Sequence, residues 1–225
     1  MAPYWYFVAP VAVFVAMQIY AHLTGRNTWV YFSKPSATLL VIGVALLSFS
    51  QTTSSPAYTT LILAGLALSL VGDIALMFQE RRLYFMVGLI FFLLAHVVYA
   101  YAFITLSGDV KNVVWFALLF VMFGIAFYLF LYSGLGKMRI PVAIYVIIIT
   151  VMVIAAASTF GSVEFSRASA WLVTIGAVLF MLSDVVLAVN KFKVPMKYNR
   201  FSLILYYGGQ FLIAVSTYYA ALPNA

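Results

Sequence analysis

The chain has no cysteine and very little charge. Of its 225 residues, 12 are Lys or Arg and 5 are Asp or Glu, so charged residues make up 8% of the chain and hydrophobic residues 66%. The absence of cysteine excludes disulfides, iron–sulfur clusters, zinc–thiolate sites and a cysteine nucleophile. The shortage of charge excludes a water-soluble fold, because soluble domains carry about 25% charged residues. The same composition excludes a disordered chain.

What the chain has instead is a series of long apolar segments. They predict an all-α polytopic membrane protein with eight transmembrane helices, since each crossing needs about 20 mostly apolar residues. Only short loops remain between the helices, so we expect residues 1–225 to form a single integral membrane domain. Pro35, Pro56 and Pro141 each lie near an expected helix start, where a missing N–H costs least. The expected spans are residues 4–23, 36–51, 57–78, 83–106, 112–132, 140–160, 168–190 and 201–221.

The basic residues are distributed unevenly over the expected loops. All Lys and Arg except Lys111 and Arg167 fall in the first, third, fifth and seventh loops. Because basic loops stay in the cytoplasm, these loops are predicted to be cytoplasmic and both termini non-cytoplasmic. The absence of cysteine and of long tails favours a bacterial inner membrane.

Two similar segments predict an internal duplication. Residues 71–76 and 182–187 both read apolar, small, Asp, β-branched, apolar, Leu, and each lies in the third span of a four-span half. The following span carries His96 in the first half and Gln210 in the second. We therefore expect two parallel four-helix repeats, covering about 1–110 and 111–225, a plan common among transporters.

Asp73 and Asp184 are the two acidic residues inside expected spans. An Asp at the middle of a membrane helix costs about 2.5–3.5 kcal/mol and usually has a function. Both lie at the same depth, so the two carboxyls could face each other across the repeat interface, and we expect them to line one cavity within roughly 10 Å of each other. A facing pair would keep one carboxyl protonated, which supplies an acid and a base for catalysis or a proton relay for transport. A purely structural pair that fixes helix packing is the third interpretation.

Further polar residues follow helical stripes near these acids. His96 would most simply be a buried hydrogen-bonding residue between helices, and Gln210 likewise. Lys34 and Arg200 precede the second and eighth spans, where they would anchor the helix ends or bind a phosphate. Two Asp and one His could ligate a metal, but no metal-ligand spacing is present and we expect no metal.

Five short motifs in order carry a family resemblance over roughly residues 30–217. They are Lys34-Pro35, Gly72-Asp73-Ile74-Ala75-Leu76, His96-Val97-Val98-Tyr99, Ser183-Asp184-Val185-Val186-Leu187 and Tyr206-Tyr207-Gly208-Gly209-Gln210. With these motifs the chain resembles the YhhN-like membrane proteins, the lysoplasmalogenase family. The Gly208-Gly209 pair departs from the bulkier residues expected there.

The resemblance implies hydrolysis of the vinyl-ether bond of lysoplasmalogens, without a cofactor, by Asp73 and Asp184. The partner would be a lysophospholipid within the membrane, and no nucleic acid is expected. The alternatives are a proton-coupled lipid or small-molecule transporter that uses the same two acids, and a non-catalytic lipid-binding protein. The residues expected to contact substrate are Lys34, His96, Tyr99, Tyr206, Gln210 and Arg200.

The charge distribution gives a topology that labelling can test. A cysteine introduced at position 2 should react with a membrane-impermeant maleimide only from the non-cytoplasmic side, because the odd-numbered loops hold most of the positive charge. A cysteine in the Lys191–Arg200 loop is the matched control and should react only from the cytoplasmic side. Labelling of position 2 from the cytoplasm alone would overturn the predicted orientation.

Overall fold

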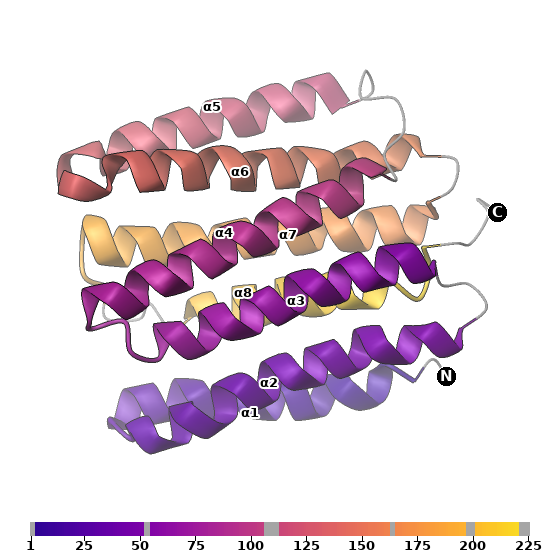
Figure 1. Cartoon of the computed structure of the whole chain (residues 1–225), viewed down its shortest axis with the longest axis horizontal. Helices are drawn as coiled ribbons and strands as arrows, with labels where there is room; N and C mark the ends of the chain where they lie inside the picture. Colours follow the sequence, from indigo (N-terminus) through magenta and orange to yellow (C-terminus); the bar gives the residue numbers. More distant parts are fainter. Residues whose placement is uncertain (1–2, 52–54, 106–112, 163–164, 197–200, 221–225) are drawn as a thin grey trace.

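The computed structural model describes residues 3–51, 55–105, 113–162, 165–196 and 201–220, and these segments contain helices and turns but no strand. Eight α-helices lie side by side as a bundle (Figure 1), which confirms the all-α membrane fold. Seven are long and apolar enough to cross a membrane, and α8 is a shorter apolar helix. The helices are α1 Trp5–Thr24, α2 Asn27–Leu47, α3 Pro56–Leu76, α4 Arg82–Thr105, α5 Val114–Leu131, α6 Arg139–Ser158, α7 Arg167–Phe192 and α8 Ser202–Ser216.

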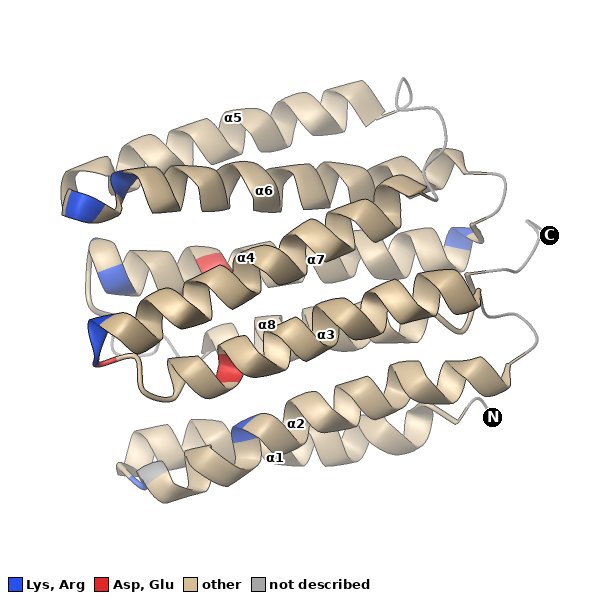
Figure 2. Ribbon diagram, viewed as in Figure 1, with Lys and Arg blue, Asp and Glu red and all other residues tan. Residues whose placement is uncertain are grey.

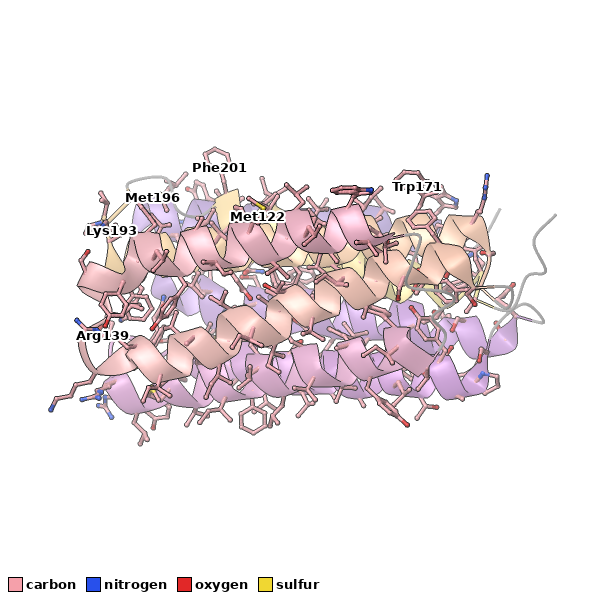
Figure 3. All side chains as sticks on the ribbon, turned by 90° about the horizontal axis from the view of Figure 1, so that it is seen from above. Met122, Arg139, Trp171, Lys193, Met196 and Phe201 are labelled. Carbon is pink, nitrogen blue, oxygen red and sulfur yellow. The ribbon has the colours of Figure 1, made fainter. Side chains whose placement is uncertain are left out.

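Both ends of the chain lie at one end of the bundle (Figure 1). Most Lys and Arg segments gather at the opposite end (Figure 2). Figure 3 labels Arg139 and Lys193 at that basic end, and Trp171 toward the other. The predicted alternation of basic and non-basic loops therefore agrees with the two ends of the bundle. The assignment of the basic end to the cytoplasm stays a prediction.

Helix α2 begins earlier than the sequence indicated. Gly25, with a φ of 71°, ends α1, and α2 starts two residues later at Asn27. The predicted start at residue 36 is therefore wrong, and Lys34 and Pro35 lie inside the helix rather than in a loop. Proline is common at helix starts, but membrane helices also tolerate it in their interior. At Pro56, the first residue of α3, the same interpretation is confirmed.

Close packing between α7 and α8 depends on glycine. A Cβ atom at Gly209 would lie 2.6 Å from the carbonyl oxygen of Gly176, and one at Gly176 would lie 2.8 Å from the carbonyl oxygen of Gly209. At Gly208, in contrast, a Cβ would meet only Leu179 Cδ1, at 3.7 Å. Small residues let membrane helices approach closely. The Gly208-Gly209 pair departs from the bulkier residues expected in the family. One of the two, Gly209, lies at a tight contact between α7 and α8.

This difference between neighbouring glycines predicts different effects of one methyl group. Gly209→Ala should lower the free energy of unfolding by about 1–3 kcal/mol, because the backbones of α7 and α8 must move apart. Gly208→Ala is the matched control and should be neutral or slightly stabilising, since alanine favours helix. Thermal unfolding of the detergent-purified variants measures both. Equal melting temperatures for the two variants would contradict the close contact.

Candidate active site

Asp73 lies in a closed polar cluster between α2, α3 and α8. Its side chain is 1% exposed. The hydroxyls of Thr38 and Tyr206 each donate a hydrogen bond to Oδ2 at 2.7 Å. The ammonium of Lys34 lies 3.3 Å from Oδ1. Both oxygens of the carboxyl are therefore bonded by the protein, which is what a buried acid in a membrane requires.

Lys34 connects this cluster to the basic end of the bundle. Its side chain is 12% exposed. It lines a polar pocket of about 260 Å³, together with Glu80 and Arg81 from the turn between α3 and α4. The hydroxyl of Tyr207 donates to the backbone carbonyl of Lys34 at 3.0 Å. Lys34 therefore borders the pocket while its ammonium is paired with the carboxyl of Asp73.

Gln210 extends the Asp73 cluster toward α4. Its Nε2 donates to Ser69 Oγ at 3.0 Å and, more weakly, to the Tyr206 hydroxyl at 3.5 Å. The Tyr99 hydroxyl donates to Gln210 Oε1 at 2.8 Å. Tyr99, Tyr206 and Gln210 thus lie together as predicted, but their polar atoms bond one another or Asp73. Their contact with substrate stays a prediction.

Asp184 lies in a second cluster, between α4, α6 and α7. The Tyr145 hydroxyl donates to Oδ2 at 2.7 Å, and His96 Nε2 lies 3.6 Å from the same oxygen. The side chain of Asp184 is 15% exposed. It lines a mainly apolar pocket between α4, α5, α6 and α7. Asp184 therefore has fewer partners than Asp73 and faces space that an apolar ligand can occupy.

His96 packs within aromatic rings. It is fully buried, with ring centroids 4.6 Å from Phe180 and 5.3 Å from Tyr145. Its Nε2 would have to move about 0.5 Å closer to form a hydrogen bond with Asp184. Such bonds are often long in a ligand-free site and shorten when substrate binds. The structure places His96 beside Asp184, and its contact with substrate stays a prediction.

The two clusters are related by an exchange of helices. Asp73, in the first half of the chain, is bonded by Tyr206 from α8, the last helix of the second half. Asp184, in the second half, is approached by His96 from α4, the last helix of the first half. Duplicated halves that exchange their fourth helices would produce this pattern. The repeat itself stays a prediction.

Aromatic rings lie between the two clusters. Phe180 packs against Tyr206 at 5.2 Å between centroids and against His96 at 4.6 Å, so it contacts a ring from each cluster. Figure 2 shows one acidic segment on α3 and one on α7. Among the described residues, the hydrogen-bond donors of the two carboxyls are different. The prediction that Asp73 and Asp184 line one cavity within roughly 10 Å, as two-carboxylate hydrolases require, therefore stays untested.

A comparison with family models finds a match over residues 29–217, with the YhhN family. The chain belongs to the YhhN family. This match covers the helices that build both clusters, and it confirms the resemblance carried by the five motifs.

Curated relatives of this YhhN chain include mammalian proteins. The chain is 36% identical over 165 residues to lysoplasmalogenase TMEM86A of Bos taurus and 33% identical over 167 residues to the Homo sapiens protein of that name, covering 70% of this chain and 65% of each relative. It is 32% identical over 165 residues to lysoplasmalogenase TMEM86B of Rattus norvegicus, covering 73% of this chain and 59% of the relative. The aligned region therefore spans less than two thirds of these relatives. No solved structure matches the chain.

Sequence reasoning missed two of the groups that bond the acids in this YhhN chain. Thr38 bonds Asp73 and Tyr145 bonds Asp184. Thr38 follows Pro35 by three residues and Tyr145 follows Pro141 by four, which is about one helical turn in each case. A hydroxyl-bearing residue about one helical turn after each proline is the sequence signal that could have identified both groups.

Two further expectations concern Arg200 and metal binding. Arg200 lies outside the described residues of the YhhN chain. In the part of the chain that the structure describes, no three His, Asp or Glu residues gather closely enough to hold a metal ion.

The ion pair of Lys34 and Asp73 predicts a double-mutant effect. Lys34→Met should lower the free energy of unfolding by about 3 kcal/mol, because it leaves a buried acid without its charged partner. Adding Asp73→Asn to Lys34→Met should recover at least half of this loss, since the remaining groups are all neutral. Thermal unfolding in detergent measures both variants. Lys137→Met, at an exposed position of the same end, is the control and should have no effect.

If the single and double variants melt at the same temperature, the two side chains do not depend on each other. That outcome would contradict the ion pair.

Proposed function

We propose that the chain hydrolyses the vinyl-ether bond of lysoplasmalogen-type lysolipids, releasing a fatty aldehyde and a glycerophospho-alcohol. The observation that carries this proposal is the carboxyl of Asp184, which lines an apolar pocket beside His96 and Tyr145. The names of the curated relatives support the substrate class. An acid at the wall of an apolar pocket suits a substrate whose reacting bond adjoins a hydrocarbon chain.

The proposed reaction begins with proton transfer to carbon. One carboxylic acid protonates the β-carbon of the double bond, and the positive charge forms on the α-carbon and its ether oxygen. Water then adds to the α-carbon and gives its proton to a carboxylate. The resulting hemiacetal breaks its bond to the glycerol oxygen, which takes the hydroxyl proton, and the aldehyde is released. Two-carboxylate glycosidases pass through a similar oxocarbenium-like state.

The two acids of this proposal have different surroundings. Asp184 borders the pocket, so it is the carboxyl that substrate reaches first, with the Tyr145 hydroxyl fixing its orientation. His96 is close enough to bond Asp184 or an attacking water after a small movement. Asp73, held by Lys34 and Tyr206, would act as the second, charged carboxyl that favours the cationic intermediate.

The proposal also includes the orientation of the protein and the membrane that contains it. With the basic end in the cytoplasm, both termini are non-cytoplasmic, and Asp184 is reached from the cytoplasmic leaflet. The absence of cysteine is compatible with a bacterial inner membrane as the site of action.

Conservative replacement of either acid tests the proposed function. Asp184→Asn and Asp73→Asn should each reduce aldehyde release at least about 100-fold, because an amide can neither donate the proton to carbon nor assist water. Tyr145→Phe should reduce the rate less, by about tenfold, since it removes only one hydrogen bond to Asp184. Mass spectrometry of derivatised aldehyde from 1-alkenyl-glycerophosphocholine and -ethanolamine in mixed micelles measures each rate.

The same assay distinguishes an enzyme from a coupled transporter. The wild-type protein should turn over in detergent, without a membrane or an ion gradient, whereas a transporter would show no chemical product. Gly208→Ala is the control for handling and should retain the wild-type rate. Full activity in both Asn variants, or no aldehyde from wild type on any vinyl-ether lysolipid, would refute the proposal.

A further inference from the structure

The pocket beside Asp184 has polar groups at two levels. Most of its lining is apolar, and the lining side chains with polar atoms are Tyr145, Thr150, Asp184 and Lys191. Asp184 and Tyr145 lie within the bundle, whereas Lys191 belongs to the last turn of α7, at the basic end. The pocket thus joins a carboxyl inside the membrane to a cation at the membrane surface.

Lys191 and Asp184 are on the same face of α7. They are seven residues apart, which is two helical turns and about 10 Å along the helix axis. Lys191 is exposed, and its ammonium lies 4.6 Å from the centre of the Phe85 ring, which also lines the pocket. This contact holds the cation at the mouth of the pocket.

A lysolipid has the matching separation of chemical groups. Seven bonds lead from its phosphorus through the glycerol to the β-carbon of the vinyl ether, and they span about 8 Å at roughly 1.2 Å per bond of an extended chain. A phosphate at Lys191 would therefore bring the vinyl ether to the level of Asp184. The hydrocarbon chain would continue along the apolar walls.

We propose that Lys191 binds the phosphate of a single-chain phospholipid whose vinyl ether lies against Asp184, and so makes this pocket selective for phosphate-bearing lysolipids. This inference rests on the proposed function and identifies the part of the site that recognises the headgroup. Helix α5 forms one wall of the pocket. It packs mainly against α6, contacts α7 little and is largely exposed, so this wall is the side from which a lipid in the bilayer would reach the pocket.

Two other lysines in the described part of the chain, Lys34 and Lys193, are less suited to this role. The charge of Lys34 is paired with Asp73. Lys193 donates to Ser133 Oγ at 2.9 Å, and its ammonium lies 5.0 Å from the centre of the Phe130 ring. Lys193 is not among the residues that line the pocket. It is a matched control for Lys191, because it lies at the same end of the same helix.

Binding of lipids that cannot be cleaved tests the inference apart from catalysis. The probes are 1-O-hexadecyl-glycerophosphocholine, which has the phosphate, and 1-O-hexadecylglycerol, which lacks it. Lys191→Gln should weaken binding of the first probe about tenfold or more, as expected for a lost charge-assisted contact. It should leave binding of the second probe unchanged. Lys191→Arg should retain the preference, and Lys193→Gln should bind both probes like wild type.

Two results would overturn the inference. Lys191→Gln would either bind the phosphate-bearing probe as tightly as wild type, or lose affinity for both probes equally. Failure of the proposed function gives a different pattern, in which wild type still prefers the phosphate-bearing probe over the phosphate-free one but releases no aldehyde from alkenyl lysolipids. For an active wild type, the KM for alkenyl-glycerophosphocholine should rise in Lys191→Gln while kcat changes less than about twofold, because Lys191 contributes binding rather than chemistry.

Discussion

A carboxyl group inside a membrane must find its hydrogen-bond partners within the protein, because no bulk water is there to supply them. The packing of this chain follows from that constraint at two places. Asp73 requires Lys34 on α2 and Tyr206 on α8, which ties the last helix to the first half of the chain. Asp184 uses Tyr145 on α6 and lies close to His96 on α4, which ties the fourth helix to the second half.

The same constraint makes the two acids unequal. Asp73 is closed off and bonded at both oxygens, one of them to a cation. Asp184 has a single hydroxyl donor and borders an apolar pocket. Paired carboxyls whose surroundings differ take different roles as acid, base or charge stabiliser. The proposed reaction uses this difference, with the less bonded acid at the substrate and the ion-paired acid behind it.

The proposed hydrolysis also requires that a lipid substrate reach the acids from the side without exposing these acids to the bilayer. Helices α7 and α8 meet closely through Gly176 and Gly209, and α3 packs closely on α4. Helix α5 is largely exposed and contacts chiefly α6. The Asp73 cluster lies between α2, α3 and α8, while the pocket of Asp184 has α5 as one wall. The carboxyl with the more exposed side chain therefore lies beside the least buried of the seven long helices.

The sequence by itself determined the membrane class, the order of the helices and the two acids that lie inside them, because hydrophobic length and intramembrane charge are local properties of the chain. The start of α2 predicted from the sequence was wrong, because a proline such as Pro35 occurs both at the start and in the interior of membrane helices. The sequence could not show that Lys34 forms an ion pair with Asp73 while His96 lies beside Asp184. Those partnerships depend on which helices become neighbours, and only the tertiary structure decides that.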